Sequence, residues 1–334
     1  MPSRTTAVER ERVPPASLER ELETHRRALT GYCYRMLGSG FEAEDAVQET
    51  MVRAWRSYDR FEGRSSLRSW LYRIATNVCL DMLRGPQRRA RPMDLSGPYT
   101  ADTPVGTTLG EHNWVEPIPD ARVVPDGGDP AEVAATRESI RLAFVSALQN
   151  LPPRQRAVLI LREVLSWQAS EVAELLGTSV ASVNSALQRA RAAMGESGQE
   201  VPGSATVDAD QQALLARYVD AFERYDIASL VELLHEDAVM SMPPFALWLR
   251  GPEQMARFFK GQGIECENSK LVATAANGCA AFGCYHRDPA GGFKPWALQV
   301  IELDGGRITG HHNFLTLLDA SLFELFGLPE HLPA

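Results

Sequence analysis

One stretch, Glu42 to Arg84, constrains the fold and the partners of this 334-residue chain more than any other. Its first half, EAEDAVQETMVRAW, puts apolar residues at helical spacing on one face and acidic residues on the other faces. Its second half is rich in Arg, Trp and Tyr and nearly free of acids. An acidic helix suits a basic protein partner. Arginines interleaved with aromatic rings suit single-stranded nucleic acid, because rings stack on bases and guanidinium groups bind phosphates.

Both halves also have an explanation that needs no partner. The acidic run is then the solvated face of a surface helix. Trp70 and Tyr72 are then core residues, and the arginines around them only keep the surface soluble. The pattern of the second half alone does not separate the two explanations.

The net charge of −9 is distributed unevenly, so it does not exclude nucleic-acid binding. Residues 201–334 carry 9 Lys and Arg against 17 Asp and Glu, whereas Arg60 to Arg91 carries eight Arg against two acids. A local basic stripe, rather than the charge of the whole chain, binds phosphates. All three lysines lie after residue 200, and this break in composition indicates a domain of different origin.

The cellular location of the protein and the redox state of its thiols are inferred from motifs that the sequence lacks. No apolar run reaches the ~18 residues of a membrane span, and residues 1–16 lack the apolar segment of a secretory signal. We therefore expect a cytoplasmic protein with a disordered tail at 1–16 and no membrane partner. The five cysteines are scattered without a CxxC pair, which predicts reduced thiols. No spacing is typical of metal ligands, and we expect no metal and no cofactor.

Helical spacing predicts a first all-α unit over residues 17–85, with helices at 18–37, 41–58 and 67–83. Ser65 or Ser66 is expected to cap the third helix. Residues 86–135 are rich in Pro, Gly, Asp and Thr and have no sustained periodicity, which predicts a linker. Its WVEPIPD island either docks on a neighbouring domain or is an incidental cluster.

Residues 136–195 form a second all-α unit, which ends in the spacing of a helix-turn-helix. We expect one helix at 154–165, another at 169–176, a turn at Gly177 and a last helix at 180–194. The outward polar side chains of the last helix can reach base edges and phosphates. They are Ser182, Asn184, Ser185, Gln188, Arg189 and Arg191.

A polar stretch at 196–205 predicts a second linker, and residues 206–330 form a third unit. Helices are expected at 211–225, 227–234 and 252–260. Five strand-like runs accompany them: VMSM, KLVATAAN, CAAFGCYH, ALQVIELD and RITGHHNFLT. Helices followed by a curved sheet predict an α+β cone. The fold class is therefore multidomain, with two all-α units and one α+β unit.

The segments EAEDAVQETMVRAW and FEGRSSLRSWLYRIATNVCLDMLR resemble domain 2 of the extracytoplasmic-function (ECF) sigma factors of bacterial RNA polymerase over more than forty consecutive residues. The resemblance implies that the first helix binds the clamp coiled coil of the polymerase β′ subunit. The residues implied there are Asp45, Gln48, Glu49 and Trp55. The following segment is implied to melt the promoter −10 element and to bind the opened strand. The residues implied there are Arg68, Trp70, Arg73, Asn77 and Arg84.

The segment LPPRQRAVLILREVLSWQASEVAELLG resembles sigma domain 4, which binds the promoter −35 element. It implies that the six polar residues of the last helix bind −35 DNA and that the unit also meets the polymerase β subunit. Many members carry Lys and Arg where this chain has Asn184 and Ala186. The −35 consensus therefore does not carry over, and affinity depends more on the polymerase. The resemblance also offers the RNA channel of the polymerase as a path for the 86–135 linker.

The segments HEDAVMSMPP, WLRGPEQM and ELDGGRITGHH resemble the SnoaL-like family of cone-shaped domains, whose interior forms a ligand pocket and sometimes a cyclase or isomerase site. Several ECF subfamilies carry such an extension, which is thought to modulate sigma activity. The implied partner of this unit is a small molecule or an intramolecular surface. The candidate pocket residues are Met240, Met242, Trp248, Phe258, Tyr285, Trp296 and His311.

A catalytic role for the third unit would require an acid/base pair aimed into the cone. His311 and His312 are adjacent on a strand and point to opposite faces, so at most one faces the cavity. His235 and Asp237 are expected in a turn after a helix, where they only cap it, and His286 is a further candidate. We expect no catalytic residues and a regulatory role instead.

The chain is therefore predicted to be an ECF-type sigma factor that binds core RNA polymerase and promoter DNA, with a fused SnoaL-like regulatory domain, and not an enzyme. One alternative is a SnoaL-like enzyme joined to a DNA-binding module. Another is a repressor that binds duplex DNA without polymerase, which the acidic total charge disfavours. We also expect the acidic third unit to hold the DNA-binding parts in an inactive or tuned arrangement.

Overall fold

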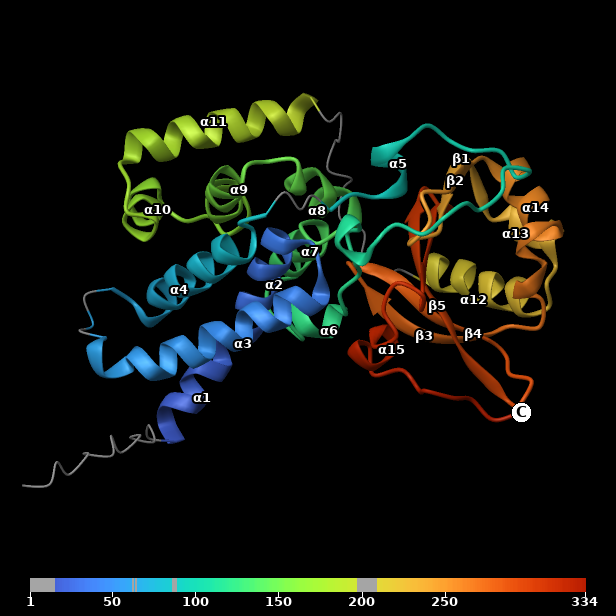
Figure 1. Ribbon diagram of the computed structural model, residues 1–334, viewed down its shortest axis with the longest axis horizontal. Coiled ribbons are helices and arrows are strands. Elements are labelled where there is room, and N and C mark those ends of the chain that lie inside the picture. The colour runs from blue at the N-terminus through green and yellow to red at the C-terminus, as the bar shows by residue number, and fades with distance from the viewer. Residues whose placement is uncertain (1–15, 62, 64, 86–88, 197–208) are drawn as a thin grey trace, which may run out of the picture.

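The computed structural model describes residues 16–334 except 62, 64, 86–88 and 197–208. The expected tail at 1–16 and the expected linker at 196–205 therefore lie outside the described residues, apart from Ala16 and Glu196. The chain has a helical half, which ends with α11, and a half built around one sheet. The two halves lie side by side (Figure 1).

Four helices and one 3-10 turn form the first unit: α1 (Ala16–Thr24), α2 (Arg26–Leu37), α3 (Gly40–Ser57), η1 (Tyr58–Arg60) and α4 (Leu67–Met82). The helix expected over 18–37 is interrupted at His25 and forms two helices. Serine caps start the two long ones, because Ser39 Oγ accepts a hydrogen bond from the Glu42 amide and Ser66 Oγ from the Ser69 amide. Helix α2 is buried from Leu29 to its end, so it is the centre of this unit.

Residues 89–138, most of the predicted linker, contain regular structure. They contain four short helices: α5 (Pro92–Leu95), η2 (Glu111–Asn113), α6 (Asp120–Val123) and α7 (Pro130–Glu138). Trp114 and Ile118 of the WVEPIPD island are fully buried, and Val115 is 2% exposed. Of the two explanations for the island, the structure therefore favours docking on neighbouring units, because its apolar side chains are buried while Pro and Gly only set the path of the segment.

The second helical unit contains α8 (Leu142–Gln149), α9 (Pro153–Leu159), a π-helical turn η3 (Ile160–Val164), α10 (Ala169–Leu176) and α11 (Val180–Glu196). The helix expected over 154–165 is thus α-helical only in its first part. Gly177 ends α10 with a φ of 61°, a left-handed conformation that glycine adopts without strain. Val183 and Leu187 of α11 are buried, as the helix-turn-helix pattern predicts.

The third unit combines helices with a six-stranded sheet. Its elements are α12 (Ala209–Glu223), α13 (Ile227–Glu232), β1 (Leu234–Ser241), β2 (Trp248–Arg250), α14 (Pro252–Lys260), η4 (Gln262–Cys266), β3 (Lys270–Ala276), β4 (Cys279–Arg287), β5 (Phe293–Asp304), β6 (Arg307–Leu315) and α15 (Leu322–Leu325). The strand order is β2-β1-β6-β5-β4-β3, with β1 and β6 parallel and the other neighbours antiparallel. The α+β prediction is confirmed, although β2 and α15 have no counterpart in the predicted elements.

The two faces of this sheet belong to two different hydrophobic cores. The inner face packs against α12, α13 and α14, through residues such as Phe222 and Met255. The outer face, with Val300 and Phe314, belongs to one continuous core that also includes the island and both helical units. Successive side chains of β6 alternate between these two faces. His311 lies on the inner face, and His312, the register partner of Val300 on β5, lies on the outer face.

Replacement of Ile118 by Ala tests whether the 89–138 segment is structural. Ile118 is fully buried, so we expect Ile118→Ala to lower the free energy of unfolding by about 2–5 kcal/mol. Urea unfolding followed by circular dichroism measures the change. Leu317→Ala is the control, because that side chain is 71% exposed and should change stability by less than about 0.5 kcal/mol. Equal stability of I118A and the wild type would show that the island is incidental.

Candidate functional site

The face of α4 combines exposed cations with a half-buried aromatic cluster. Arg68, Asn77 and Arg84 are exposed. Trp70 is half-buried and packs on Phe61, with ring centroids 4.9 Å apart. Tyr72 is 1% exposed and lies in the core, as the explanation without a partner proposed. Each explanation therefore holds for some of the residues. Tyr72 is a core residue that holds the helix in place, whereas its neighbours remain on the surface.

The acidic face of α3 is open. Asp45, Gln48 and Glu49 are exposed, and Glu49 Oε1 lies 2.6 Å from Arg53 Nε in an intrahelical ion pair. Trp55 is half-buried and borders a groove of about 460 Å³ between α1 and α3. The four residues thus lie along one side of the helix that no described element covers completely.

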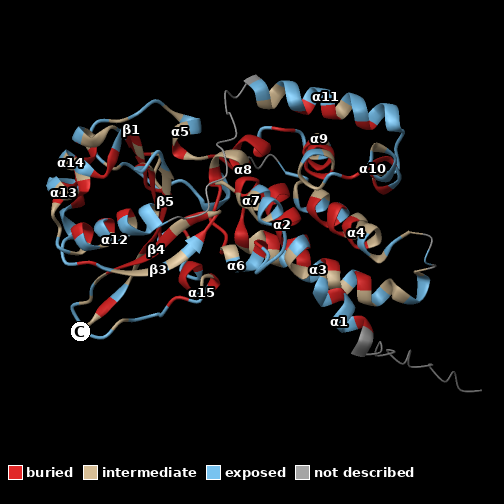
Figure 2. Cartoon of the chain, turned by 180° about the vertical axis from the view of Figure 1, so that it is seen from behind, coloured by how far each residue is buried: buried red, intermediate tan, exposed pale blue. Residues whose placement is uncertain are grey.

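Much of helix α11 is coloured as exposed in Figure 2. Ala190 is fully buried together with Val183, which fixes the inward face of the helix. All six predicted DNA-binding residues are exposed: Ser182, Asn184, Ser185, Gln188, Arg189 and Arg191. Arg191 Nη2 lies 2.6 Å from Glu163 Oε1, so one of the two candidate cations is already paired.

Helix α10 and the residues before it contact α4. The Arg68 guanidinium carbon lies 5.4 Å from the ring centroid of Trp167 and 5.7 Å from that of Tyr72. Arg73 Nη2 lies 3.2 Å from Glu174 Oε1. Two of the five predicted strand-binding residues are therefore engaged by the helix-turn-helix unit.

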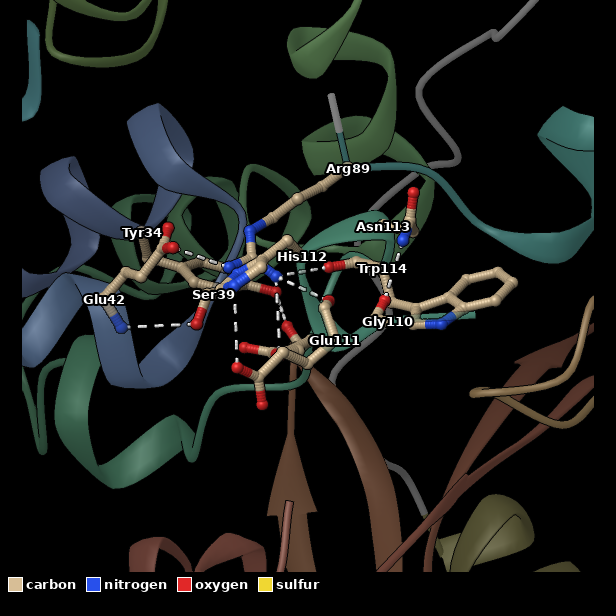
Figure 3. Close-up of polar contacts among 10 residues, drawn as sticks. Tyr34, Ser39, Glu42, Arg89, Gly110, Glu111, His112, Asn113 and Trp114 are labelled. Carbon is tan, nitrogen blue, oxygen red and sulfur yellow. Dashed lines mark hydrogen bonds and ion pairs between the residues drawn. The ribbon is translucent and has the colours of Figure 1, made fainter. Parts of the chain in front are cut away.

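Arg89 is a buried polar hub between the first unit and the 89–138 segment (Figure 3). Its guanidinium pairs with Glu42 Oε1 at 2.7 Å and with Glu116 Oε1 at 3.4 Å. It also donates to the carbonyl oxygens of Trp114 at 2.8 Å and Glu111 at 3.1 Å. Burial raises the pKa of Glu116, and the charge of Arg89 opposes that shift. Removal of Arg89 would leave buried acceptors without a partner, so the hub fixes the segment to α3.

The turn between β3 and β4 reaches all the other units through Asn277, which the sequence prediction missed. Asn277 Nδ2 donates to Tyr34 Oη of α2 at 2.5 Å and to the Ile140 carbonyl before α8 at 2.7 Å. Asn277 Oδ1 accepts from the Ile118 amide at 3.0 Å. The sequence signal for this turn was the Asn277-Gly278 dipeptide, because Asn-Gly favours a two-residue hairpin with positive φ at both positions. The two φ values in the structure are 56° and 73°.

The cavity inside the cone is almost filled. Only about 10 Å³ of it is open to the centre of a water molecule. Of the seven candidate pocket residues, only His311 lines it. Met240, Met242 and Phe258 are buried in the surrounding core, and Trp296 packs against that core.

Two further pocket candidates and the candidate acids and bases lie elsewhere. Tyr285 lies on the outer face of the sheet and donates a hydrogen bond to the Pro329 carbonyl. Its assignment to the pocket is therefore wrong. The face on which a strand residue lies depends on strand register. Trp248 donates from Nε1 to the Ser96 carbonyl. His235 and Asp237 are exposed within β1 rather than in a turn after a helix.

His311 forms a buried polar cluster with two neighbours. Tyr218 Oη lies 2.9 Å from His311 Nε2 and donates to Gln299 Oε1 at 2.7 Å. Burial lowers the pKa of His311 to about 3, so its imidazole is neutral near pH 7. The groups suit proton transfer, but the cavity beside them has hardly any space for a substrate.

Comparison with known proteins assigns each unit to a family. The family models Sigma-70 region 2, Sigma-70 region 4 and SnoaL-like domain match residues 22–89, 141–194 and 215–311. The ECF RNA polymerase sigma factor SigG of Mycobacterium tuberculosis is 44% identical over 315 residues, which cover 93% of this chain and 83% of the relative. The chain belongs to the ECF sigma factors. The predicted family and fold class are thereby confirmed.

Two further comparisons support the arrangement of this sigma factor. The ECF RNA polymerase sigma factor SigJ of Mycobacterium tuberculosis is 30% identical over 247 residues, or 72% of each chain. A crystal structure of SigJ has a TM-score of 0.58 at 22% identity and covers 93% of this chain and 100% of its own, so the two share a fold. The match to sigma region 2 ends at Arg89, the residue at the centre of the polar hub.

Among the described residues, no group of three or more His, Cys, Asp or Glu could hold a metal ion. In the same residues, no helix is long and apolar enough to cross a membrane.

The depressed pKa of His311 makes stability depend on pH. The unfolded chain binds a proton at this histidine below about pH 6.5, whereas the folded chain resists it down to about pH 3. The contribution of His311 to the free energy of unfolding should therefore fall as the pH is lowered, by about 2 kcal/mol between pH 7 and pH 5. Urea unfolding at a series of pH values measures this slope.

A matched pair of variants assigns that slope. His311→Gln should make the pH dependence shallower, whereas His235→Gln should leave it unchanged, because His235 is exposed. The same slope in H311Q and the wild type would contradict the assignment to His311.

Proposed function

We propose that this sigma factor binds core RNA polymerase through the open face of α3. Asp45, Gln48 and Glu49 would meet basic side chains of the β′ clamp, and Trp55 would contribute apolar contact at the groove beside α1. This proposal rests on one observation. The residue sets assigned to polymerase, to the −10 strand and to −35 DNA lie on three separate helices, α3, α4 and α11, apart from Arg84 just after α4, and most of these side chains face solvent.

We assign the −10 strand to the face of α4. Arg68, Arg73 and Arg84 would bind phosphates, and Trp70 would stack on a base. Asn77 is exposed near the end of the helix, where its amide can bind the edge of a flipped base.

The −35 element would meet α11, with Ser182, Asn184, Ser185 and Gln188 toward base edges and Arg189 and Arg191 toward phosphates. Only two of these six residues are cations, so direct affinity for DNA is low and the polymerase supplies much of the binding. The β subunit is the proposed contact of sigma region 4. Together these contacts direct transcription from specific promoters.

The SnoaL-like domain would regulate the sigma regions and would not act as an enzyme. Its cone is nearly filled, which disfavours the alternative of a cyclase or isomerase fused to a DNA-binding module. Its outer face shares a core with both sigma regions, as expected of a domain that sets their arrangement. Its partner would be intramolecular or a small molecule that opens the cone.

The proposed domains are sigma domain 2 at 17–85, a linking segment at 86–135, sigma domain 4 at 136–195 and the regulatory domain at 206–330. The site of action of a sigma factor is the cytoplasm, where we place this chain. Deletion of residues 201–334 is a poor test of regulation, because it would expose apolar side chains such as Ile118 and Ile140 that pack in the shared core.

Run-off transcription from a cognate promoter with core polymerase tests the proposed function. Product that requires both this chain and the polymerase supports it, and absence of product with the full chain contradicts it. Promoter opening followed with a fluorescent base at −10 should be about tenfold weaker for Asn77→Ala, because the flipped base loses its partner. Gln212→Ala is the control, since Gln212 is exposed on α12, far in sequence from the sigma regions.

Substitution of the α3 face separates polymerase binding from DNA binding. Asp45→Asn combined with Gln48→Ala should weaken binding to core polymerase by about tenfold in a pull-down titration, since an exposed charge and an amide are lost at the centre of the contact. Asp210→Asn, an exposed change on α12, should have no effect. Equal polymerase affinity of the double variant and the wild type would remove α3 from the interface.

A further inference from the structure

The face of α4 assigned to the −10 strand is occupied in the free chain. Arg68 lies over the rings of Tyr72 and Trp167, and Arg73 pairs with Glu174. Trp167 stands just before α10, and Glu174 lies within it. Sigma region 4 therefore contacts the same side chains that are proposed to bind the promoter strand.

The groups that region 4 supplies have the chemistry of nucleic acid. A carboxylate on Arg73 takes the place of a phosphate oxygen, because guanidinium binds both by the same kind of ion pair. An indole ring beneath Arg68 takes the place of a base, because Arg stacks on either π system. Glu174 and Trp167 thus present an anion and a ring seven residues apart on one surface.

The contact between region 4 and α4 has features that favour its exchange for another ligand. The Arg73 and Glu174 side chains are 39% and 68% exposed, and an ion pair so open to water contributes little stability. Arg73 Nε and Trp167 Nε1 are buried without a hydrogen-bond partner. Ser166, next to Trp167, has a φ of 55°, which is costly for a residue other than glycine. These groups would gain partners or lose strain if α10 moved off α4.

The tip of the β3–β4 hairpin opposes that movement. Asn277 is fully buried, and its amide holds Tyr34 of region 2, Ile118 of the linking segment and Ile140 before region 4 at the same time. Gly278 adds a fourth contact, because its amide donates to Asp120 Oδ1 at 2.8 Å. A Cβ at Gly278 would lie 2.8 Å from the Arg137 carbonyl, so the tip fits closely.

We propose that region 4 masks the −10 face of region 2 as an internal substitute for DNA, through Glu174 and Trp167, and that the Asn277 tip of the SnoaL-like domain holds the mask in place. The proposal rests on the assignment of α4 to the −10 strand. Promoter DNA and polymerase then compete with α10 for α4, and the C-terminal domain sets the strength of that competition.

Binding of a fluorescent single-stranded −10 oligonucleotide to the full chain without polymerase tests the proposal, measured by anisotropy at one fixed salt concentration. Glu174→Gln should bind about two- to five-fold more tightly than the wild type, because the exposed ion pair no longer competes. Asn277→Gly should bind at least about threefold more tightly, since it removes three hydrogen bonds while glycine keeps the positive φ. Circular dichroism confirms that both variants are folded.

Two controls separate masking from a general loss of negative charge. Glu132→Gln removes an exposed carboxylate on α7 and should leave affinity within about 1.5-fold of wild type. In an Arg73→Gln background, Glu174→Gln should give no further gain in oligonucleotide affinity. The guanidinium for which Glu174 competes with the DNA is already absent there. The same gain for E132Q and E174Q, or no gain for both E174Q and N277G, would overturn the proposal.

Run-off transcription of the same proteins distinguishes this proposal from the proposed function. Normal run-off product together with unchanged oligonucleotide affinity in the variants overturns the mask and leaves the sigma function intact. Increased affinity of E174Q and N277G without any run-off product supports the mask and overturns the proposed function.

Discussion

The arrangement of this sigma factor depends on one buried side-chain amide. An amide has two donor hydrogens and one acceptor oxygen, and Asn277 uses them on three segments that lie far apart in the sequence. Since buried polar groups must be paired, none of these segments can leave without stranding a donor or an acceptor. The Asn-Gly turn allows this approach, because it places the side chain at the tip of a hairpin rather than on the face of a sheet.

The linking segment is the second half of that junction. Arg89 ties it to α3 on one side, and the Ile118 amide and carbonyl pair with Asn277 on the other. A buried arginine is tolerated because two carboxylates and two carbonyl oxygens surround it. The segment therefore relates α3 to the C-terminal domain through polar contacts, which have specific geometry, as well as through apolar packing.

Local periodicity predicted what depends on neighbours in the sequence. The helices α3, α4, α10 and α11 begin and end within about two residues of their predicted bounds, because caps and apolar spacing determine them. Asn277 and Arg89 were missed, since their partners are up to 243 residues away. Tyr285 was assigned to the wrong side of the sheet because its neighbours on both faces are apolar, so the sequence shows no alternation. Trp167 gave no signal of its contact with Arg68, because that contact depends on how two units pack.

The shared outer core limits how this molecule can open. Separation of the sheet from the helices would bring Val300, Phe314, Ile118 and Ile140 into water, at a cost of roughly 1.5–3 kcal/mol for each side chain. Such a sum approaches the whole stability of a typical domain, so thermal fluctuation alone rarely reaches that state. Full separation therefore requires a partner that covers the exposed surface. A movement of α10 alone would uncover Trp167 and Val172 but would leave the sheet packed on the helices, so it costs less than full separation.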